Sequence, residues 1–286
     1  MRRSGLDGVL PLLACPHCAA VLERVDDRVV SCAAGHRFDI AKQGYLSLLG
    51  KRSRTDTGDS ADMVAARLTF LGAGHYLPVA EAIADRVDPG PVLEIGSGTG
   101  YYLAHALCRI GADGAAAADV GIALDASRYA ARRAATAHQR IGSIVADAWS
   151  RLPVRDGVIG AVMSVFAPRD PAEIARVLAP AGRVVVVTPE PDHLVEIRSE
   201  LGLLAVDPGK PDRLAEAFAG LSRPVDRAGV RREMRLTRAD ISALVRMGPA
   251  ARHLNPDALG HAIEQFDEFT AVTLEVTISV LTLDHP

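Results

Sequence analysis

A glycine-rich turn directly after an apolar run is the feature that most constrains the fold of this chain. The apolar run 92–95 has the composition of a buried strand, and it leads into Gly96, Gly98 and Gly100 at alternate positions. Glycine lets the backbone turn sharply and approach a ligand, because no Cβ is in the way. A helix that begins near Tyr101 would present its unpaired N–H groups at this turn. The segment therefore predicts a strand, a ligand-binding turn and a helix in succession.

Acidic residues stand at the ends of two neighbouring predicted strands. Glu94 ends the first strand in the spacing E-x-G-x-G-x-G, and Asp125 closes the next run, 121–125. This spacing differs from the dinucleotide pattern G-x-G-x-x-G and from the P-loop. It resembles the S-adenosylmethionine site of class I methyltransferases, in which the glycine turn packs against the cofactor and the second acid holds the ribose hydroxyls. Another Rossmann-like nucleotide site is the alternative.

The chain beyond the turn alternates predicted strands and helices. The strands are expected at about residues 121–125, 143–146, 158–165 and 182–188, and the helices at about 101–110, 127–138 and 171–178. This alternation predicts a parallel sheet with helices on both faces. Two later β-rich runs, 231–236 and 270–283, enclose predicted helices at about 238–247 and 256–265. We therefore expect an α/β fold of the class I methyltransferase type, Rossmann-like, with a mostly parallel seven-stranded sheet and a C-terminal antiparallel strand.

The pattern C-x2-C-x13-C-x3-H near the N-terminus predicts a metal site. Its members are Cys15, Cys18, Cys32 and His36. Three thiolates and one imidazole are the ligand set of a closed structural zinc site. A predicted hairpin, with arms at 21–25 and 28–31, would bring the two ligand pairs together. A redox C-x-x-C or a disulfide is the alternative, disfavoured by a cytoplasmic location and by the absence of a thioredoxin-like βαβ context.

Composition and net charge limit which partners, nucleic acid or membrane, this protein can bind. A hydrophobic content of 49%, a charged content of 23% and a net charge of −3 are ordinary for a soluble protein and exclude a uniformly basic nucleic-acid coat, although not a local basic patch. No apolar run is long enough to span a bilayer. We expect a cytoplasmic protein without a membrane partner. Lys51, Arg52 and Arg54 form a basic segment that can clamp RNA phosphates, with a solvated linker as the alternative.

Taken together, the motifs resemble the RlmA family of bacterial 23S rRNA (guanine-N1) methyltransferases nearly end to end. The resemblance is carried by the zinc pattern extended to Tyr45, by K-R-S-R at 51–54, by G-D-S-x-x-M-x-x-A-R at 58–67 and by F-L-x-x-G-H-Y at 70–76. Shorter matches follow at Tyr101-Tyr102, Phe166-Ala167-Pro168, Thr188-Pro189, His193-Leu194 and Met234-Arg235-Leu236. The resemblance implies homodimers that methylate a guanine in a 23S rRNA hairpin near the peptide exit tunnel, with macrolide resistance in some hosts.

The resemblance also assigns cofactor residues. Tyr76, the glycine turn with Tyr101, and His193 fall at the family's S-adenosylmethionine positions, while Asp125 and Asp147 fit the acids that face ribose and adenine in methyltransferases generally. Tyr76 as a core aromatic and His193 as a loop histidine bonded to backbone are the alternatives.

Asp59, in the G-D-S motif, is the candidate general base, because guanine N1 carries a proton that must leave during methylation. A helix-capping acid next to Ser60 is the alternative role.

We expect a zinc-ribbon RNA-recognition domain over 1–50, a basic loop and helical connector over 51–88, and the methyltransferase domain over 89–286.

A methyltransferase acting on a small natural product is the alternative function. A third interpretation is a ribbon-bearing RNA-binding protein with an inactive catalytic domain, against which the intact glycine turn and both strand-end acids count. The ribbon and the basic segment favour RNA over a small molecule.

Overall fold

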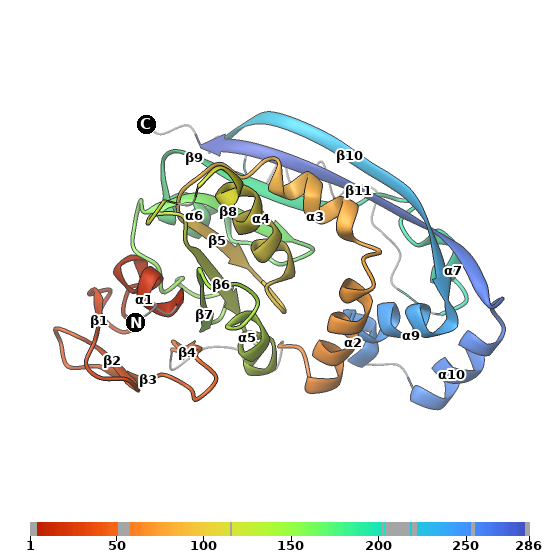
Figure 1. Cartoon of the computed structure of the whole chain (residues 1–286), viewed down its shortest axis with the longest axis horizontal. Coiled ribbons are helices and arrows are strands. Elements are labelled where there is room, and N and C mark those ends of the chain that lie inside the picture. The colour runs from red at the N-terminus through yellow and green to blue at the C-terminus, as the bar shows by residue number, and fades with distance from the viewer. Residues whose placement is uncertain are drawn as a thin grey trace.

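A large, twisted β-sheet is the centre of the molecule. The computed structural model describes residues 5–50, 58–114, 116–201, 203, 218, 222–252 and 255–283. Within these residues the sheet has eight strands in the order β10-β11-β9-β8-β5-β6-β7-β4 (Figure 1). The strands are β4 Leu46–Ser47, β5 Val92–Ile95, β6 Gly121–Asp125, β7 Ile141–Val145, β8 Ile159–Val165, β9 Leu178–Pro189, β10 Ser222–Thr237 and β11 Phe269–Leu283.

Strand direction confirms the predicted fold class. The strands β5 to β9 pair in parallel, whereas β11 pairs antiparallel with both β9 and β10. The seven strands from β5 to β11 therefore form the mostly parallel class I methyltransferase sheet with an antiparallel C-terminal strand. The eighth strand, β4, was not predicted. Its two residues follow the ribbon and pair in parallel with β7 at the edge of the sheet.

Helices lie on both faces of the sheet. They are α1 Gly5–Val9, α2 Ala61–Gly72, α3 Leu77–Ala84, α4 Tyr101–Ile110, α5 Arg128–Ala134, α6 Pro171–Val177, α7 Val195–Arg198, α9 Arg238–Arg246 and α10 Pro256–Glu264. Side-chain caps begin several of them, such as Ser60, which accepts from Met63 N, and Ser127, which accepts from Tyr129 N and Ala130 N. The predicted helices are confirmed, although α5 ends before the expected residue 138. No described helix is long and apolar enough to cross a bilayer.

The sheet separates two hydrophobic clusters. Along β9, Val185 and Val187 belong to one cluster and Val184 and Val186 to the other, because successive side chains of a strand point to opposite faces. The first cluster includes side chains of α2, α3, α4 and α9. The second includes ribbon residues, Val30 among them, together with residues of α1 and α6. The ribbon thus shares a core with one face of the sheet, while the proposed domain limits at residues 50 and 88 stay a prediction.

Candidate functional site

The N-terminal ribbon is built from three short antiparallel strands, β1 Leu22–Arg24, β2 Val29–Cys32 and β3 Arg37–Asp39. One tight turn follows Cys15, which precedes β1, and another follows Cys32, which ends β2. Ala19 N donates to Cys15 O at 2.8 Å, and Gly35 N donates to Cys32 O at 2.9 Å. Ala19 and Gly35 both have positive φ, 58° and 82°. These turns fold the chain back on itself, so that the four predicted ligands face one another.

The geometry of this cluster fits a zinc ion. The ligand atoms of Cys15, Cys18, Cys32 and His36 all lie within 4.8 Å of one another. Cys18 Sγ lies 3.6 Å from Cys32 Sγ, and His36 Nδ1 lies 3.5 Å from Cys15 Sγ and 3.4 Å from Cys32 Sγ. Tetrahedral zinc with usual bond lengths would place two sulfurs about 3.8 Å apart and a sulfur and a nitrogen about 3.6 Å apart. The sulfur separation far exceeds a disulfide bond of about 2.05 Å.

The thiols of the cluster sit in different electrostatic surroundings. Burial raises the pKa of Cys15 to about 11. Burial also acts upward on Cys32, but hydrogen bonds from the backbone and side chain of His36 outweigh it and lower its pKa to about 6. His17 stacks on Phe38, with ring centroids 5.8 Å apart, and is not a member of the ligand cluster. The donor set is therefore three sulfurs and one nitrogen, which leaves no open position for catalysis.

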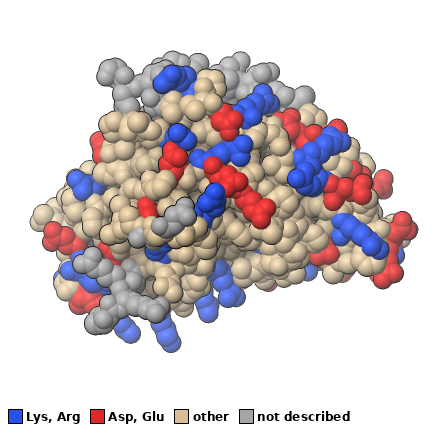
Figure 2. Space-filling view, turned by 45° about the horizontal axis from the view of Figure 1, so that its top comes forward, with Lys and Arg blue, Asp and Glu red and all other residues tan. Residues whose placement is uncertain are grey.

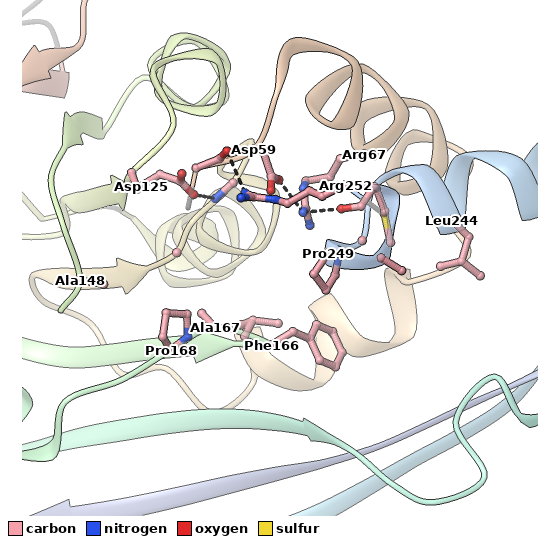
Figure 3. Close-up of a pocket in the computed structure, with 18 of the residues that line it drawn as sticks. Asp59, Arg67, Asp125, Ala148, Phe166, Ala167, Pro168, Leu244, Pro249 and Arg252 are labelled. Carbon is pink, nitrogen blue, oxygen red and sulfur yellow. Dashed lines mark hydrogen bonds and ion pairs between the residues drawn. The ribbon is translucent and has the colours of Figure 1, made fainter. Parts of the chain in front are cut away.

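A cavity of about 610 Å³ opens where β5, β6, β7 and β8 end (Figure 3). Ligands of open α/β sheets bind at such carboxyl ends. Most of the predicted cofactor residues meet here. The lining includes Asp59, Tyr76, Gly96, Gly98, Asp125, Asp147 and His193. Glu94, Gly100 and Tyr101 were also predicted but are not among the lining residues, and Lys51, Arg52 and Arg54 lie outside the described residues.

The glycine turn requires glycine at each of its three positions. Gly96, Gly98 and Gly100 have φ values of 67°, 53° and 76°, which L side chains rarely adopt. A Cβ on Gly96 would lie 2.7 Å from Ala167 Cβ, and one on Gly98 would lie 3.2 Å from Arg67 Cδ. The turn is thus packed from both sides, while its backbone borders the cavity. Such a bare backbone suits close approach of a cofactor.

Asp125 is fastened to this turn by hydrogen bonds. Its Oδ2 accepts from Gly98 N at 2.8 Å, and its Oδ1 accepts from Ser127 N at 2.8 Å. Burial raises the pKa of Asp125, and these two bonds partly oppose that effect by favouring the carboxylate. Each carboxylate oxygen keeps a further lone pair for a hydroxyl donor. The arrangement can therefore hold the two hydroxyls of a ribose.

Glu94 and Asp147 have local structural partners. Glu94 Oε2 accepts from Leu103 N at 3.2 Å, in the first turn of α4, and burial raises the pKa of this carboxyl to about 8. Glu94 thereby joins β5 to the start of α4 behind the cavity wall. Asp147 accepts from Trp149 N at 2.9 Å and from Ser150 Oγ at 3.0 Å. These bonds hold the loop after β7, and Trp149 in that loop also lines the cavity.

Three aromatic rings meet on one wall of the cavity. Tyr76 Oη lies 3.3 Å from His193 Nε2, and Glu275 N donates to His193 Nδ1 at 3.2 Å. A backbone amide can only donate, so in the neutral ring the proton is on Nε2 and Tyr76 Oη accepts it. Burial raises the pKa of Tyr76 well above its ordinary value, so the phenol keeps its own proton as a donor. The ring of Phe166 stacks beside His193, with centroids 6.1 Å apart and planes at 21°.

An ion pair faces this wall across the cavity (Figure 3). Arg67 Nη2 donates to Asp59 Oδ2 at 2.7 Å and to Met247 O at 2.8 Å, which ties α2 to the end of α9. Arg252 Nη2 donates to Gly58 O at 2.9 Å. Figure 3 shows Asp59, Arg67 and Arg252 on one side of the cavity, with Phe166 on the other. The open volume lies between them.

Some lining residues had no predicted role. Arg67 and Phe166 belong to the motifs A-R and F-A-P that carried the family resemblance, so a signal for them existed in the sequence. Trp149 is the single tryptophan of the chain and follows a strand-end acid, which was a weaker signal. Arg252 had no local signal, because the chain reaches the cavity only through the packing of α9.

Comparisons with known proteins agree with this geometry. A family model described as "RlmA, N-terminal", a zinc ribbon, matches residues 13–54. A 23S rRNA (guanine(748)-N(1))-methyltransferase from Streptomyces fradiae is 43% identical over 280 residues, covering 95% of this chain and 97% of the relative. A protein from Micromonospora griseorubida, provisionally named 23S rRNA (guanine-N(1)-)-methyltransferase, is 41% identical, with 95% and 97% covered.

Solved structures include more distant neighbours. An S-adenosylmethionine-dependent methyltransferase from Geobacter sulfurreducens, in complex with S-adenosyl-L-homocysteine, is 16% identical with a TM-score of 0.42, covering 74% of this chain and 91% of that one. The two full-length relatives, the matched ribbon and the strand order lead to one conclusion. The chain belongs to the RlmA family of 23S rRNA (guanine-N1) methyltransferases.

Proposed function

We propose that this protein transfers a methyl group from S-adenosylmethionine to N1 of a guanine in a 23S rRNA hairpin. One observation carries the proposal: a single cavity joins the glycine turn and Asp125 to an exposed aromatic side chain, Phe166, and to a carboxylate, Asp59. The first pair suits a nucleoside cofactor, and the second pair suits a planar base that must lose a proton. The names of the full-length relatives support guanine N1 as the acceptor.

The cofactor would lie along the ends of β5, β6 and β7. Gly96 and Gly98 offer backbone without a Cβ, Asp125 would hold the ribose hydroxyls, and Asp147 and Trp149 would flank the adenine. When bound, S-adenosylmethionine supplies an electrophilic methyl group on a sulfonium. The remaining task of the protein is to place the nucleophile on the methyl–sulfur axis and to exclude water.

The guanine would enter between Phe166 and Asp59. Guanine N1 lies on the pairing edge, so the base must leave its stack before it can react. The ring of Phe166, which is 43% exposed, offers a face on which the base can stack. As the N1–methyl bond forms, the N1 proton must pass to a base. Asp59 is the candidate, because Arg67 holds its Oδ2 and thereby aims the carboxylate at the cavity.

The wider setting of this proposal is a cytoplasmic enzyme that acts as a homodimer on ribosomal RNA. The zinc ribbon and the basic segment with Lys51, Arg52 and Arg54 would contribute to RNA recognition. A small natural product as substrate is the competing candidate, because the cavity alone does not distinguish a flipped base from a free heterocycle.

Methylation of a 23S rRNA hairpin tests the proposal. We expect labelled methyl from S-adenosylmethionine to enter the hairpin, and reverse transcription to stop at one guanine, because N1-methylation blocks pairing. A hairpin with N1-methylguanosine already at that position should accept no label. Transfer of the label only to a small metabolite, with no label in rRNA, would replace the RNA proposal with the competing one.

A further inference from the structure

Helix α5 has an arginine-rich outer face. Arg128, Tyr129, Arg132 and Arg133 are exposed, whereas the inner side of the helix consists of buried alanines, Ala130, Ala131 and Ala134. The small inner side lets α5 lie against the glycine turn, where Ala134 Cα would be 3.2 Å from a Cβ on Gly100. The helix carries three positive charges and no acidic residue in seven residues.

These three arginines have no carboxylate partner among the residues that the structure describes, in contrast to ten other arginines. Among the residues described, ion pairs to Asp or Glu are formed by Arg24, Arg67, Arg86, Arg109, Arg140, Arg151, Arg176, Arg183, Arg227 and Arg231. Within the same residues, Arg132 and Arg133 form no ion pair. Arg128 contacts the neighbouring Tyr129, with its Cζ 5.0 Å from the ring centroid and its Nη2 3.1 Å from the hydroxyl.

Figure 2 shows how positive and negative side chains are distributed over one face of the surface. Over most of the face shown, blue and red side chains are interspersed, whereas blue side chains project together from its lower edge. In Figure 1, α5 lies toward the lower side of the molecule, between the ribbon with β4 and helix α2. In a protein with a net charge of −3, three arginines on one short helix without an acidic residue concentrate positive potential locally.

Helix α5 lies next to the cavity on one side and next to the ribbon on the other. Asp125 and Ala126 line the cavity, and the next residue, Ser127, caps α5. Ser127 Oγ also donates to Asp59 O at 2.6 Å, which ties the start of α5 to the segment that carries the candidate base. On the other side, α5 packs against β7, and β7 pairs with β4 at the end of the ribbon. Helix α5 therefore lies between the ribbon and the cavity, with its arginines on the outer side.

We propose that the outer face of α5, with Arg128, Arg132 and Arg133, binds the phosphate backbone of the RNA substrate next to the flipped base. The inference rests on the proposed RNA methylation and adds a surface to it. Guanidinium groups form paired hydrogen bonds with phosphate oxygens, and they require no base sequence to do so. The face would hold the RNA in register while the target base reaches Phe166, and the Arg128–Tyr129 pair adds a stacking surface for an unpaired nucleotide.

A triple variant, Arg128→Gln, Arg132→Gln and Arg133→Gln, tests the proposal. Glutamine is a good helix former, so α5 should persist while three charges are lost. The matched control carries Arg109→Gln, Arg151→Gln and Arg183→Gln, which removes the same charge from arginines in exposed ion pairs away from α5. A third variant with lysine at the three α5 positions keeps the charge but loses the paired hydrogen bonds.

Binding of a fluorescent 23S rRNA hairpin is measured across a salt series, with cofactor affinity measured by calorimetry. Each lost phosphate contact lowers the slope of log affinity against log salt by about 0.7–0.9, so the glutamine variant should lose roughly 2–3 in slope and about 10- to 100-fold in affinity at low salt. The lysine variant should keep most of the slope. The control variant should match wild type, and cofactor affinity should stay the same in all of them.

The outcomes separate this proposal from the proposed function. If wild type methylates the hairpin and the glutamine variant keeps the wild-type affinity and salt slope, α5 is a solvated face and only this inference fails. If wild type neither binds nor methylates the hairpin, both fail. Vesicles containing anionic phosphatidylglycerol form the last arm. Loss of vesicle binding with RNA binding intact would assign the face to membranes and overturn the RNA assignment.

Discussion

Asp125 accepts a hydrogen bond from the backbone N–H of Gly98 across 2.8 Å, so the acid that ends β6 and the turn that follows β5 form one unit. The two strands are adjacent and parallel, which brings their carboxyl ends to the same edge of the sheet. The carboxylate is held by two backbone donors before any ligand arrives. Such preorganisation reduces the ordering that binding must impose, and it makes Asp125 a sensitive probe of the proposed cofactor site.

Asp125→Ala should weaken binding of S-adenosylmethionine. The variant would remove the two charge-assisted hydrogen bonds that we propose to the ribose, each worth on the order of 1.5–3 kcal/mol, so we expect a loss of roughly 100-fold or more in affinity by calorimetry. Asp125→Asn should also weaken binding, because its NH2 group would face either Gly98 N–H or Ser127 N–H and cannot accept from it. Exposed Asp156, which pairs with Arg151 and Arg176, supplies the control Asp156→Asn. Wild-type affinity in Asp125→Ala, with native circular dichroism, would place the ribose elsewhere.

Zinc should be lost on substitution of a ligand in the ribbon. Cys15→Ser removes one of the four converging ligand atoms, and Cys15 is buried where the ribbon meets the sheet. We expect one zinc per chain in wild type and much less in the variant by metal analysis, with a lower melting temperature because the ribbon core depends on the metal. Cys108→Ser is the control, since Cys108 is exposed on α4 and outside the cluster. Zinc-free wild type, prepared without chelator, would contradict the assignment.

The raised pKa of the buried Glu94 carboxyl predicts that the stability of the protein depends on pH. Burial raises its folded-state pKa to about 8, against 4.5 for an unperturbed glutamate. The folded state therefore prefers the protonated form, and stability is full below about pH 4.5 and declines as pH rises toward 8. Glu94→Gln keeps an acceptor for Leu103 N without the charge. The advantage of the variant should grow by on the order of 1 kcal/mol per pH unit within this window, measured by denaturant unfolding.

Glu173 provides a control for this experiment, because its pKa is shifted in the opposite direction to that of Glu94. Burial acts upward on its pKa, but hydrogen bonds from Arg176 and Leu152 N outweigh it and lower the value. Its contribution to stability is therefore present above the unfolded pKa and is lost only as pH falls through the lower folded value. The difference between wild type and Glu173→Gln should stay constant between about pH 5.5 and 8. A constant difference for Glu94→Gln as well would show that Glu94 is ionised in the folded state.

The sequence predicted those parts of the structure whose causes are local. Residues 92–110 carry a strand, a turn with positive φ and a helix within a single segment, and the observed bounds of β5 and α4 match the prediction. The same holds for the zinc ligands, which two short turns bring together. The role of Arg67 could not be predicted from local sequence, because its hydrogen bond to Met247 O spans 180 positions along the chain. Likewise, the two residues of β4 form a strand because they pair with β7 at the edge of the sheet, which local sequence does not show.

Phe166 is a further residue whose conformation depends on its surroundings. Its φ of 53° is one that bulky residues rarely adopt, and its ring is 43% exposed at the cavity rather than buried in a core. A strained backbone of this kind costs on the order of 1–3 kcal/mol and persists when the neighbouring structure imposes it, often at a functional site. The chain thus keeps an aromatic ring at the end of β8 at a cost in stability, which is reasonable if the ring receives the target base.

Substitution of Phe166 separates stability from activity. Phe166→Gly should be more stable than Phe166→Ala by about 1 kcal/mol, because glycine accepts positive φ without strain. Both should lower the rate of RNA methylation by roughly 10- to 100-fold, since stacking of a base on an aromatic side chain is worth about 1–3 kcal/mol. Phe166→Tyr keeps the ring and should retain most activity. Because Phe166 would contact the base and not the ribose, S-adenosylmethionine affinity should stay within about twofold of wild type. Equal methylation rates for Phe166→Ala and wild type would leave the strained ring without a role in base binding.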